Sequence, residues 1–565
     1  MARSPERSRP LRVPRLALAV ALALPSAAAA FTPESLHAAW PQVRFVATPA
    51  PCLRHGELVA RLGELAERHA GELRLETAGR SVQGRTIHLL TIGRGARKVL
   101  LWSQMHGDEP AATPALLDLA DYLLSNRDEP DAARILDELT LLIVPMLNPD
   151  GTEAYVRQNA QAIDVNRDAL ALSTPEGRLL KALRDRHRPI LGFNLHDQNR
   201  RRTAGDSGVL ATNAVLAVTG DEANTLTSGR LRAKRACAAI ATALGEFFPG
   251  GMARYDEEWS PRAFGDNLTA WGTPVVLIES GGLPPGTPFE ELTRLNFVAL
   301  ATALAELARN DLADHDPAVY DELPANELGD WFDVAVRGGA IRQPGSAAPY
   351  RADLVFDRLV GDRVAAGCDG PAEQWSEIGE VGDARYLHAG RDVDAGGAIL
   401  VAPFRVAVRG YRARRWLDGA ALDRLARLGV VEVDWQVSRR RAEAARTRAA
   451  GIAGPGRPRL RVTADAGAPL FELRSAPGAP ASDTLGDVLR ALAGAGHQEL
   501  VAGGVDAAFA RLWGEPEPLA GRPLLRPGAG AHFLIVDTAD GGLDLDTARL
   551  RSVWIDGREV AGASP

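Results

Sequence analysis

Three side chains in this sequence are of the kinds that bind a zinc ion. His106 and Glu109 lie three positions apart in His106-Gly-Asp-Glu109, and His196 follows ninety residues after the first histidine. A catalytic zinc ion takes imidazole nitrogens and carboxylate oxygens from three protein residues, and its fourth position stays open for water. Two histidines and one glutamate meet that requirement, so the sequence predicts one zinc ion per chain at these residues.

A fourth residue, Glu279, ends the apolar run Val275-Val-Leu-Ile-Glu279. A carboxylate at the end of a buried strand costs free energy unless it has a partner. This placement favours a functional role for Glu279 over a purely structural one.

These residues stand where apolar, strand-like runs end. The run from Lys98 to Met105 leads directly into His106, and Phe193-Asn-Leu-His196 ends at the second histidine. Such runs alternate with helical periodicity at residues 54–72, 111–125, 176–188, 229–247 and 289–309. The alternation predicts an α/β fold with a mostly parallel central sheet and helices on both faces. The carboxyl ends of parallel strands share one edge of such a sheet, so the candidate residues are expected to meet there.

Further motifs accompany the His-x-x-Glu pair in a set order. A lone His-x-x-Glu occurs often by chance, so its context decides its meaning. The context consists of Gly79-Arg-Ser-Val-Gln-Gly84-Arg85, Leu147-Asn148-Pro149-Asp150-Gly151, Tyr155-Val-Arg157, Asp164-Val-Asn166-Arg167, the strand-terminal His196 and Glu279-Ser-Gly. In this order the chain resembles the zinc carboxypeptidases of the carboxypeptidase A type, over about residues 54–310.

The resemblance implies a role for each matching position. His106, Glu109 and His196 would bind zinc, and Glu279 would be the general base that takes a proton from the attacking water. Arg157 would stabilise the oxyanion of the tetrahedral intermediate. Asn166 and Arg167 would bind the terminal carboxylate of a peptide with a free C-terminus, and Tyr255 would contact the substrate.

Several of these residues also have a structural interpretation. His106 is compatible with a hydrogen-bonded core histidine, and His196 with a pair to Asp197. Arg157 could be a solvated loop charge. Arg167 could form an ion pair with Asp164 or Asp168, and Tyr255 could serve loop packing.

The sequence departs from the family in the stretch that follows His196. Three consecutive arginines, Arg200, Arg201 and Arg202, stand where digestive relatives have small polar and aromatic residues. They form either a local positive field beside the site or a solvated charge cluster. The substrate side-chain pocket is expected in the segment before Glu279, where Phe264 would suit an apolar residue and Asp266 a basic one.

A length of 565 residues is too great for one core and indicates two or three domains. Arginines followed by the apolar stretch from Leu16 to Pro25 and by small residues up to Ala30 predict a secretory signal peptide. We expect the signal peptide at residues 1–30, the catalytic domain at 31–310, a linker at 311–330 and a β-rich accessory domain at 331–565.

Val393-Asp-Ala-Gly-Gly397 leads to Ala402-Pro-Phe404 in the accessory domain. With this segment the domain weakly resembles the β-sandwich found at the two ends of amidohydrolase chains. Arg405-Val-Ala-Val-Arg409 stands where the first metal-binding His-x-His pair of that family would be, and no His-x-His occurs in the chain. We therefore expect a noncatalytic domain, with some helix around 420–427 and 439–450.

Charge and localisation restrict the partners. The formal net charge is −7 with basic and acidic residues interspersed, which gives no indication of nucleic-acid binding. The signal peptide predicts a periplasmic or extracellular protein with no stable membrane span after cleavage. Three cysteines allow at most one disulfide, and the oligomeric state stays open.

The sequence thus predicts a secreted zinc-dependent carboxypeptidase with Glu279 as general base. An amidoacid deacylase on the same scaffold is one alternative. A catalytically silent peptide-binding protein is another.

Overall fold

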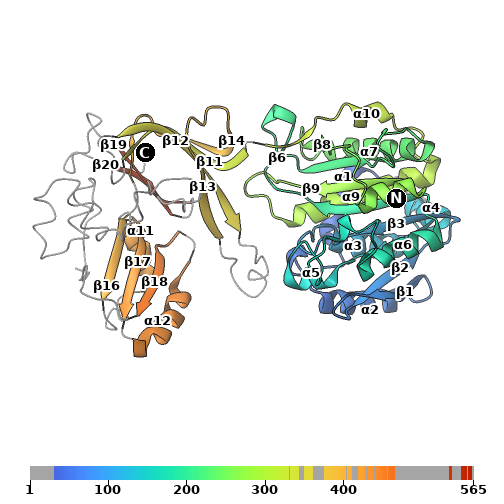
Figure 1. The fold of residues 1–565 in the computed structure, drawn as a ribbon, viewed down its shortest axis with the longest axis horizontal. Coiled ribbons are helices and arrows are strands. Elements are labelled where there is room, and N and C mark those ends of the chain that lie inside the picture. Colours follow the sequence, from blue (N-terminus) through green and yellow to red (C-terminus); the bar gives the residue numbers. More distant parts are fainter. Residues whose placement is uncertain are drawn as a thin grey trace, which may run out of the picture.

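The computed structural model of the protein describes most of the chain (Figure 1). The described residues are 31–329, 331–342, 349–360, 374–401, 404–409, 418–427, 430–437, 439–454, 456–464, 533–537, 549–555 and 558–562. The predicted signal peptide at residues 1–30 lies outside them.

A mixed eight-stranded sheet forms the centre of the amino-terminal part, with strand order β1-β2-β4-β3-β5-β9-β7-β8. The middle strands β4, β3, β5 and β9 run parallel to one another, and antiparallel neighbours flank them. The bounds are Leu73–Arg80 (β1), Thr86–Ile92 (β2), Arg97–Trp102 (β3), Leu139–Val144 (β4), Leu191–Asp197 (β5), Asn213–Ala217 (β7), Met252–Arg254 (β8) and Val275–Ser280 (β9). Because helices cover this mostly parallel sheet, the predicted α/β fold is confirmed.

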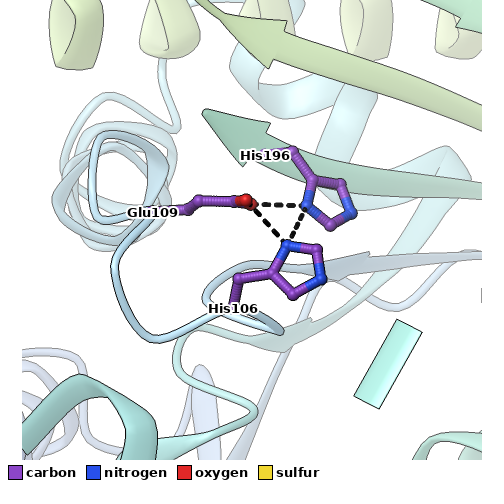
Figure 2. A group of neighbouring side chains, drawn as sticks. All are labelled: His106, Glu109 and His196. Carbon is purple, nitrogen blue, oxygen red and sulfur yellow. Dashed lines mark hydrogen bonds and ion pairs between the residues drawn. The ribbon is translucent and has the colours of Figure 1, made fainter. Parts of the chain in front are cut away.

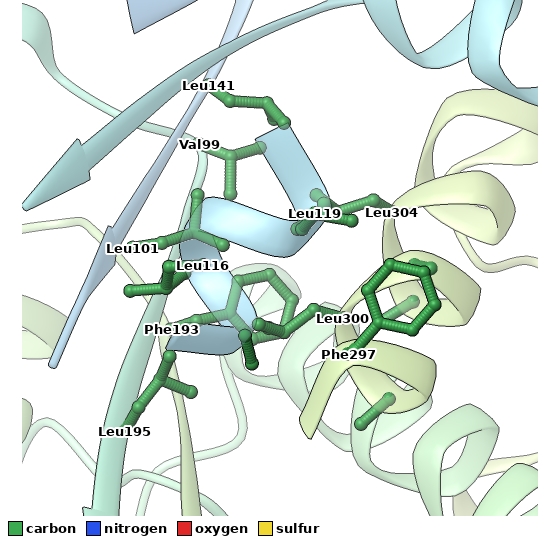
Figure 3. Close-up of a cluster of buried hydrophobic side chains, with 14 of the residues drawn as sticks. Val99, Leu101, Leu116, Leu119, Leu141, Phe193, Leu195, Phe297, Leu300 and Leu304 are labelled. Carbon is green, nitrogen blue, oxygen red and sulfur yellow. The ribbon is translucent and has the colours of Figure 1, made fainter. Parts of the chain in front are cut away.

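Alternation along β3 divides the core into two layers. Val99 and Leu101 point to one face of the sheet, where they pack with leucines of α3 (Ala112–Ser125) and α9 (Glu290–Asn310) (Figure 3). Leu100 and Trp102 point to the other face and pack with α6 (Pro175–His187) and α8 (Phe264–Ala270). Each fully buried side chain of this size contributes about 1.5–3 kcal/mol, so the strands that carry the candidate site are firmly held.

The five helices predicted from periodicity are confirmed as α2 (His55–Arg68), α3, α6, α7 (Ser228–Gly245) and α9. Thr174 and Thr227 begin α6 and α7 by accepting hydrogen bonds from backbone N–H groups of the first turn. The remaining helices of this part are α1 (Pro33–Val43), α4 (Pro130–Glu138), α5 (Pro149–Ala154), α8 and three short 3₁₀ turns. No helix in the described ranges is both long and apolar enough to cross a membrane.

The segment 311–330, expected to be a linker, folds onto the amino-terminal part. It contains α10 (Pro317–Asp321) and β10 (Asn326–Leu328), which pairs antiparallel with β6 (Arg202–Ala204). The buried Tyr320 hydroxyl donates to Glu257 at 2.7 Å and accepts from the Ala217 N–H at 3.2 Å. The acidic composition that suggested a linker belongs to the exposed side of this segment, while Tyr320 anchors its inner side.

One sheet of the carboxy-terminal part joins two separated stretches of chain. Strands from residues 331–401 pair with strands from residues 533–562 where β15 meets β19. Phe356 and Trp554 meet edge to face in its core, with ring centroids 5.8 Å apart. The bounds are Trp331–Arg342 (β11), Tyr350–Val360 (β12), Gln374–Gly382 (β13), His388–Asp394 (β14), Ile399–Val401 (β15), Phe404–Arg409 (β16), Phe533–Asp537 (β19), Arg549–Ile555 (β20) and Arg558–Gly562 (β21), of which β16 belongs to the next sheet.

A second sheet lies between these two stretches in the sequence. It holds three parallel strands in the order β16-β17-β18, with β17 at Val430–Val437 and β18 at Arg459–Ala464. The crossover helices α11 (Gly419–Arg427) and α12 (Arg439–Ile452) match the helices expected around 420–427 and 439–450. The parallel pairing was not predicted, because the alternation in Val433-Asp-Trp435-Gln-Val437 is more typical of antiparallel strands.

Candidate active site and metal centre

The structure brings His106, Glu109 and His196 together at one edge of the central sheet (Figure 2). His106 and Glu109 lie in the loop between β3 and α3, and His196 lies near the carboxyl end of the adjacent parallel strand β5. The two Nδ1 atoms of the histidines are 3.2 Å apart. Glu109 Oε1 lies 2.7 Å from His106 Nδ1, and Glu109 Oε2 lies 2.6 Å from His196 Nδ1.

This donor set fits a zinc ion. A tetrahedral zinc ion with bonds of about 2.0–2.2 Å needs ligand atoms roughly 3.3–3.5 Å apart. The three observed atoms would have to spread by less than about 1 Å to reach that spacing. All three residues are at most 8% exposed, so solvent does not compete strongly for these donors.

The pKa shifts of Glu109 and His196 suit a metal site. Burial is the largest influence on Glu109 and would raise its pKa, but the His196 and His106 imidazoles lower that pKa to about 2. Burial lowers the pKa of His196. Metal ligands must be ionised carboxylates and neutral imidazoles, so the pKa shifts of Glu109 and His196 favour metal binding. Burial would lower the pKa of His106, but the carboxylates of Glu109 and Asp164 raise it.

The Asn148-Pro149-Asp150-Gly151 motif supports the loop that carries His106. Asn148 Oδ1 accepts from Gly151 N at 3.0 Å, and its Nδ2 donates to the Met105 carbonyl at 3.3 Å. Gly107 lies so close to Gly151 that a Cβ added at Gly107 would lie 1.9 Å from the Gly151 carbonyl carbon. The motif therefore holds the loop that carries the candidate ligands His106 and Glu109.

Asp150 of the same motif holds the turn between β1 and β2. Its carboxylate accepts from Ser81 Oγ at 2.8 Å, Gln83 N at 2.9 Å and Arg85 Nη1 at 2.7 Å. Both the upstream Gly-Arg-Ser motif and the Asn-Pro-Asp-Gly motif are thus parts of one scaffold beside the site.

Asp197, which the sequence suggested as a partner of His196, instead binds the backbone before helix α3. Its Oδ2 accepts from Ala111 N at 3.0 Å, just before helix α3 begins. This contact ties the end of β5 to the loop that carries Glu109. It fixes the distance between two of the candidate ligands.

Sequence reasoning missed the role of Asp164. Its Oδ1 lies 3.0 Å from His106 Nε2, and its Oδ2 accepts from Arg157 Nε at 3.0 Å. A carboxylate on the far nitrogen of a ligand histidine fixes the ring orientation. The available signal was the Asp-x-Asn turn, in which Asp164 Oδ1 also accepts from Asn166 N at 2.9 Å.

Glu279 lies directly beside His196. The two residues are register partners on the parallel strands β5 and β9, so their side chains project from the same face of the sheet. Burial raises the pKa of Glu279 well above its ordinary value, and the carboxylates of Glu109 and Asp197 raise it further. A buried carboxyl with a raised pKa next to a metal site is suited to proton transfer.

Arg157 reaches across the candidate ligands instead of pointing to solvent. Its Nη1 lies 3.2 Å from Glu109 Oε1 and 3.1 Å from His106 Nδ1, while Asp164 holds its Nε. This is the position for a cation that faces the reacting oxygen of a substrate.

Asn166 and Arg167 lie together in a short 3₁₀ turn. Asn166 Oδ1 accepts from Phe264 N at 2.9 Å, which ties the turn to α8. Arg167 is exposed and donates to the Asn166 carbonyl at 2.9 Å. Within the described part of the chain Arg167 forms no ion pair with Asp164 or Asp168, so its guanidinium remains available to a substrate carboxylate.

Tyr255 follows β8 and lies near the candidate base. Burial and then the Glu279 carboxylate raise the pKa of its hydroxyl. Of the two pocket residues considered, Phe264 is fully buried in the core, and Asp266 accepts from Ser260 N at 2.8 Å. Burial raises the pKa of Asp266 to about 6.

Two of the three consecutive arginines connect the two parts of the molecule. Arg200 donates to both oxygens of Asp333 at 3.1 and 2.8 Å, and Arg201 donates from Nε to the Trp331 carbonyl at 2.8 Å. Asp357 lies 3.6 Å from Arg200 and 3.4 Å from Arg201. These contacts, here called the arginine clasp, attach β11 and β12 to the loop that follows His196, so Arg200 and Arg201 are not a solvated cluster.

Comparison with known proteins identifies part of this region. Residues 58–184 match the family model of the zinc carboxypeptidases. The probable carboxypeptidase 2 of Trichophyton verrucosum is 34% identical over 112 residues, which cover 20% of this chain and 21% of the relative. Carboxypeptidase M of Mus musculus is 32% identical over 126 residues, which cover 19% and 28%. The chain thus spans between a fifth and a third of the length of these curated relatives.

Solved structures that match part of this chain include a metallo-carboxypeptidase from Burkholderia cenocepacia. It is 21% identical, with a TM-score of 0.38, and the match covers 45% of this chain and 68% of the other. The resemblance predicted from the motifs is confirmed over residues 58–184, which contain His106, Glu109 and Arg157. His196 and Glu279 lie beyond the matched residues.

Proposed function

We propose, on the premise that residues 58–184 are part of a zinc carboxypeptidase domain, that this protein is a secreted zinc-dependent carboxypeptidase. The observation that carries the proposal is the convergence of two imidazole nitrogens and one carboxylate beside the strand partner Glu279. A buried metal-ligand set next to a buried carboxyl of raised pKa is the arrangement of a metal-assisted hydrolase.

His106, Glu109 and His196 would hold the zinc ion. When bound, the ion lowers the pKa of a water molecule and polarises the scissile carbonyl. Asp164 keeps the His106 ring in the orientation that presents Nδ1 to Glu109, and Asp197 keeps Glu109 and His196 in register.

Glu279 takes the proton from the attacking water and delivers it to the leaving amine. Burial favours the protonated form after the first transfer, which is the form needed for the second. Arg157 faces the same region and stabilises the negative charge that develops on the carbonyl oxygen. Asn166 and Arg167 bind the terminal carboxylate, and Tyr255 closes the side nearest Glu279.

The remaining parts of the chain have supporting roles in this proposal. Residues 1–30 direct secretion to the periplasm or the outside, residues 31–310 contain every catalytic group, and residues 331–565 are a noncatalytic accessory region. Residues 311–330 are more than a connection, because Tyr320 and β10 contact the loops around the site.

The test compares a peptide with a free C-terminus and the same peptide with a C-terminal amide. Loss of one partner of a desolvated charge pair costs about 2–5 kcal/mol, so the amide should be cleaved at least roughly 30-fold more slowly. Arg167→Ala should remove most of this preference by slowing cleavage of the acid. Arg157→Ala should slow both substrates.

Three outcomes would contradict the proposal in different ways. Equal rates on acid and amide would exclude a carboxypeptidase. Turnover of N-acylated single amino acids but not of peptides would indicate an amidoacid deacylase. Tight peptide binding by a zinc-loaded protein without turnover would indicate a silent binding protein.

A further inference from the structure

The third arginine after His196 differs from the other two. Arg200 and Arg201 are engaged with Asp333 and Asp357 in the arginine clasp. Arg202 is half-buried and forms no ion pair with any carboxylate in the described part of the chain. A partly desolvated guanidinium without a counter-ion is unfavourable, so its position needs a reason.

Arg202 is directed toward the candidate active site. Its guanidinium carbon lies 5.6 Å from the centroid of the Tyr255 ring. Arg202 also lies close enough to Glu279 to oppose the rise in the pKa of that carboxyl. Arg202 and Arg157 therefore both act electrostatically on Glu279, but Arg157 is already bound to Asp164 and Glu109.

The backbone around Arg202 is fixed by contacts on both sides. Arg202 begins β6, which pairs with β10, and its Nη1 donates to the Asn326 carbonyl at 2.8 Å. Asn326 Nδ2 in turn donates to Gln198 Oε1 at 2.7 Å. One N–H of the guanidinium is thus used for positioning, and the side chain keeps further donors for another group.

Arg202 is also separate from the residues proposed to bind the terminal carboxylate. Arg167 lies in the turn tied to α8 and is near Asp266, whereas Arg202 begins β6 and is near Tyr255. The two cations thus lie on different elements. A substrate held by Arg167 at its terminal residue presents the preceding residue to another part of the site.

We infer that Arg202 is a specificity-determining residue that binds an anionic side chain on the penultimate residue of the peptide, next to the scissile bond. The inference rests on the proposed function and adds a substrate class to it. The enzyme should prefer peptides with an acidic penultimate residue.

The experiment uses pairs of N-acylated peptides that differ only by Glu or Gln at the penultimate position. The terminal residue is kept constant and is one that the full-length, zinc-loaded enzyme removes. A charge-assisted hydrogen bond contributes about 1.5–3 kcal/mol, so kcat/KM should be at least about tenfold higher for the Glu peptide. Arg202→Gln should abolish this ratio, Arg202→Lys should keep part of it, and Arg186→Gln, an exposed arginine on α6, should leave it unchanged.

The two proposals fail in distinguishable ways. No cleavage of either peptide would refute the proposed function. Cleavage of the Gln peptide with a Glu-to-Gln ratio near one, or a ratio that survives in Arg202→Gln, would overturn the inference alone. An Arg202→Gln variant that shifts only the acid limb of the pH profile and keeps the Glu-to-Gln ratio would also overturn it.

A measurement on the unaltered protein covers the case in which Arg202→Gln does not fold. The preference for Glu should weaken as salt concentration rises, because screening weakens the attraction between the Glu side chain and Arg202, whereas its effect on the terminal carboxylate is common to both peptides. A ratio independent of salt would contradict an electrostatic origin.

Discussion

The metal side and the rim of the candidate site are held in place by different parts of the chain. The metal side is fixed locally, since the partners of His106 and Glu109 are Asp164, Arg157 and the neighbouring strand β5. The rim consists of the loop after His196 and the loop around Tyr255. Its partners come from residues 320–357, which lie outside the match to the zinc carboxypeptidase family.

This difference separates chemistry from substrate choice. Strand ends in a well-packed sheet, together with the loop that directly follows β3, place the candidate ligands and the candidate base. The loops of the rim have partners farther along the chain. Tyr320 holds one of them through Glu257, and Asp333 holds the other through Arg200. Under the proposed function, the carboxy-terminal region would influence which peptides bind without carrying a catalytic group.

Removing the base should have the largest effect on turnover. Glu279→Gln keeps the shape of the side chain but not its proton acceptor, so kcat should fall by about 100-fold or more while zinc content stays at one per chain. Elemental analysis and steady-state kinetics on the same preparation would check this. Glu258→Gln, an exposed glutamate in the Tyr255 loop, is the matched control and should behave as the unaltered protein. Near-normal turnover in Glu279→Gln would assign Glu279 a structural role.

The metal side, which is held by residues close in sequence, is the part of the site that the sequence could predict. The strands and five helices follow from apolar periodicity, and their ends agree with cap residues such as Thr174 and Thr227. The ligand set follows from residue types at strand ends. Because motif spacing reports on nearby residues, the metal side was accessible to sequence reasoning, although the roles of its residues remain predictions.

The contacts of the rim could not be predicted from the local sequence. Asp333 and Asp357 lie more than a hundred residues after Arg200, and nothing in their local sequence indicates an arginine partner. Asp164 was close in sequence, but Arg157, Arg167 and His106 were all chemically suitable partners. The three-dimensional structure shows that Asp164 pairs with His106 and Arg157. The sequence alone could not select these partners, because a pair with Arg167 would balance the charge of Asp164 equally well.

Asp164 offers a sharper test of the metal side. Asp164→Asn removes the carboxylate that holds the His106 ring, so zinc affinity should fall by about 10–100-fold while the fold remains. Competition with a chelator would measure the affinity, and thermal unfolding of the zinc-free protein would check the fold. Asp206→Asn, at an exposed aspartate beyond β6, should leave the affinity unchanged. An unaltered zinc affinity in Asp164→Asn would mean that the ring is held by the sheet alone.

The smallest effect is expected from a substitution in the arginine clasp. This substitution tests whether the rim and the metal side are held independently. Asp333→Asn weakens a bidentate pair in which the aspartate is 6% exposed and Arg200 is 41% exposed, so solvent screening limits the loss to about 1 kcal/mol. We expect KM to rise by roughly fivefold at most, with kcat and zinc content unchanged, because only the loop after His196 is loosened. Asp392→Asn removes a comparable pair to Arg337 on the same sheet, but there the aspartate is 56% exposed, so neither KM nor stability should change measurably. A fall in kcat or in zinc content in Asp333→Asn would show that the carboxy-terminal region also positions the catalytic groups, and the separation between metal side and rim would then be wrong.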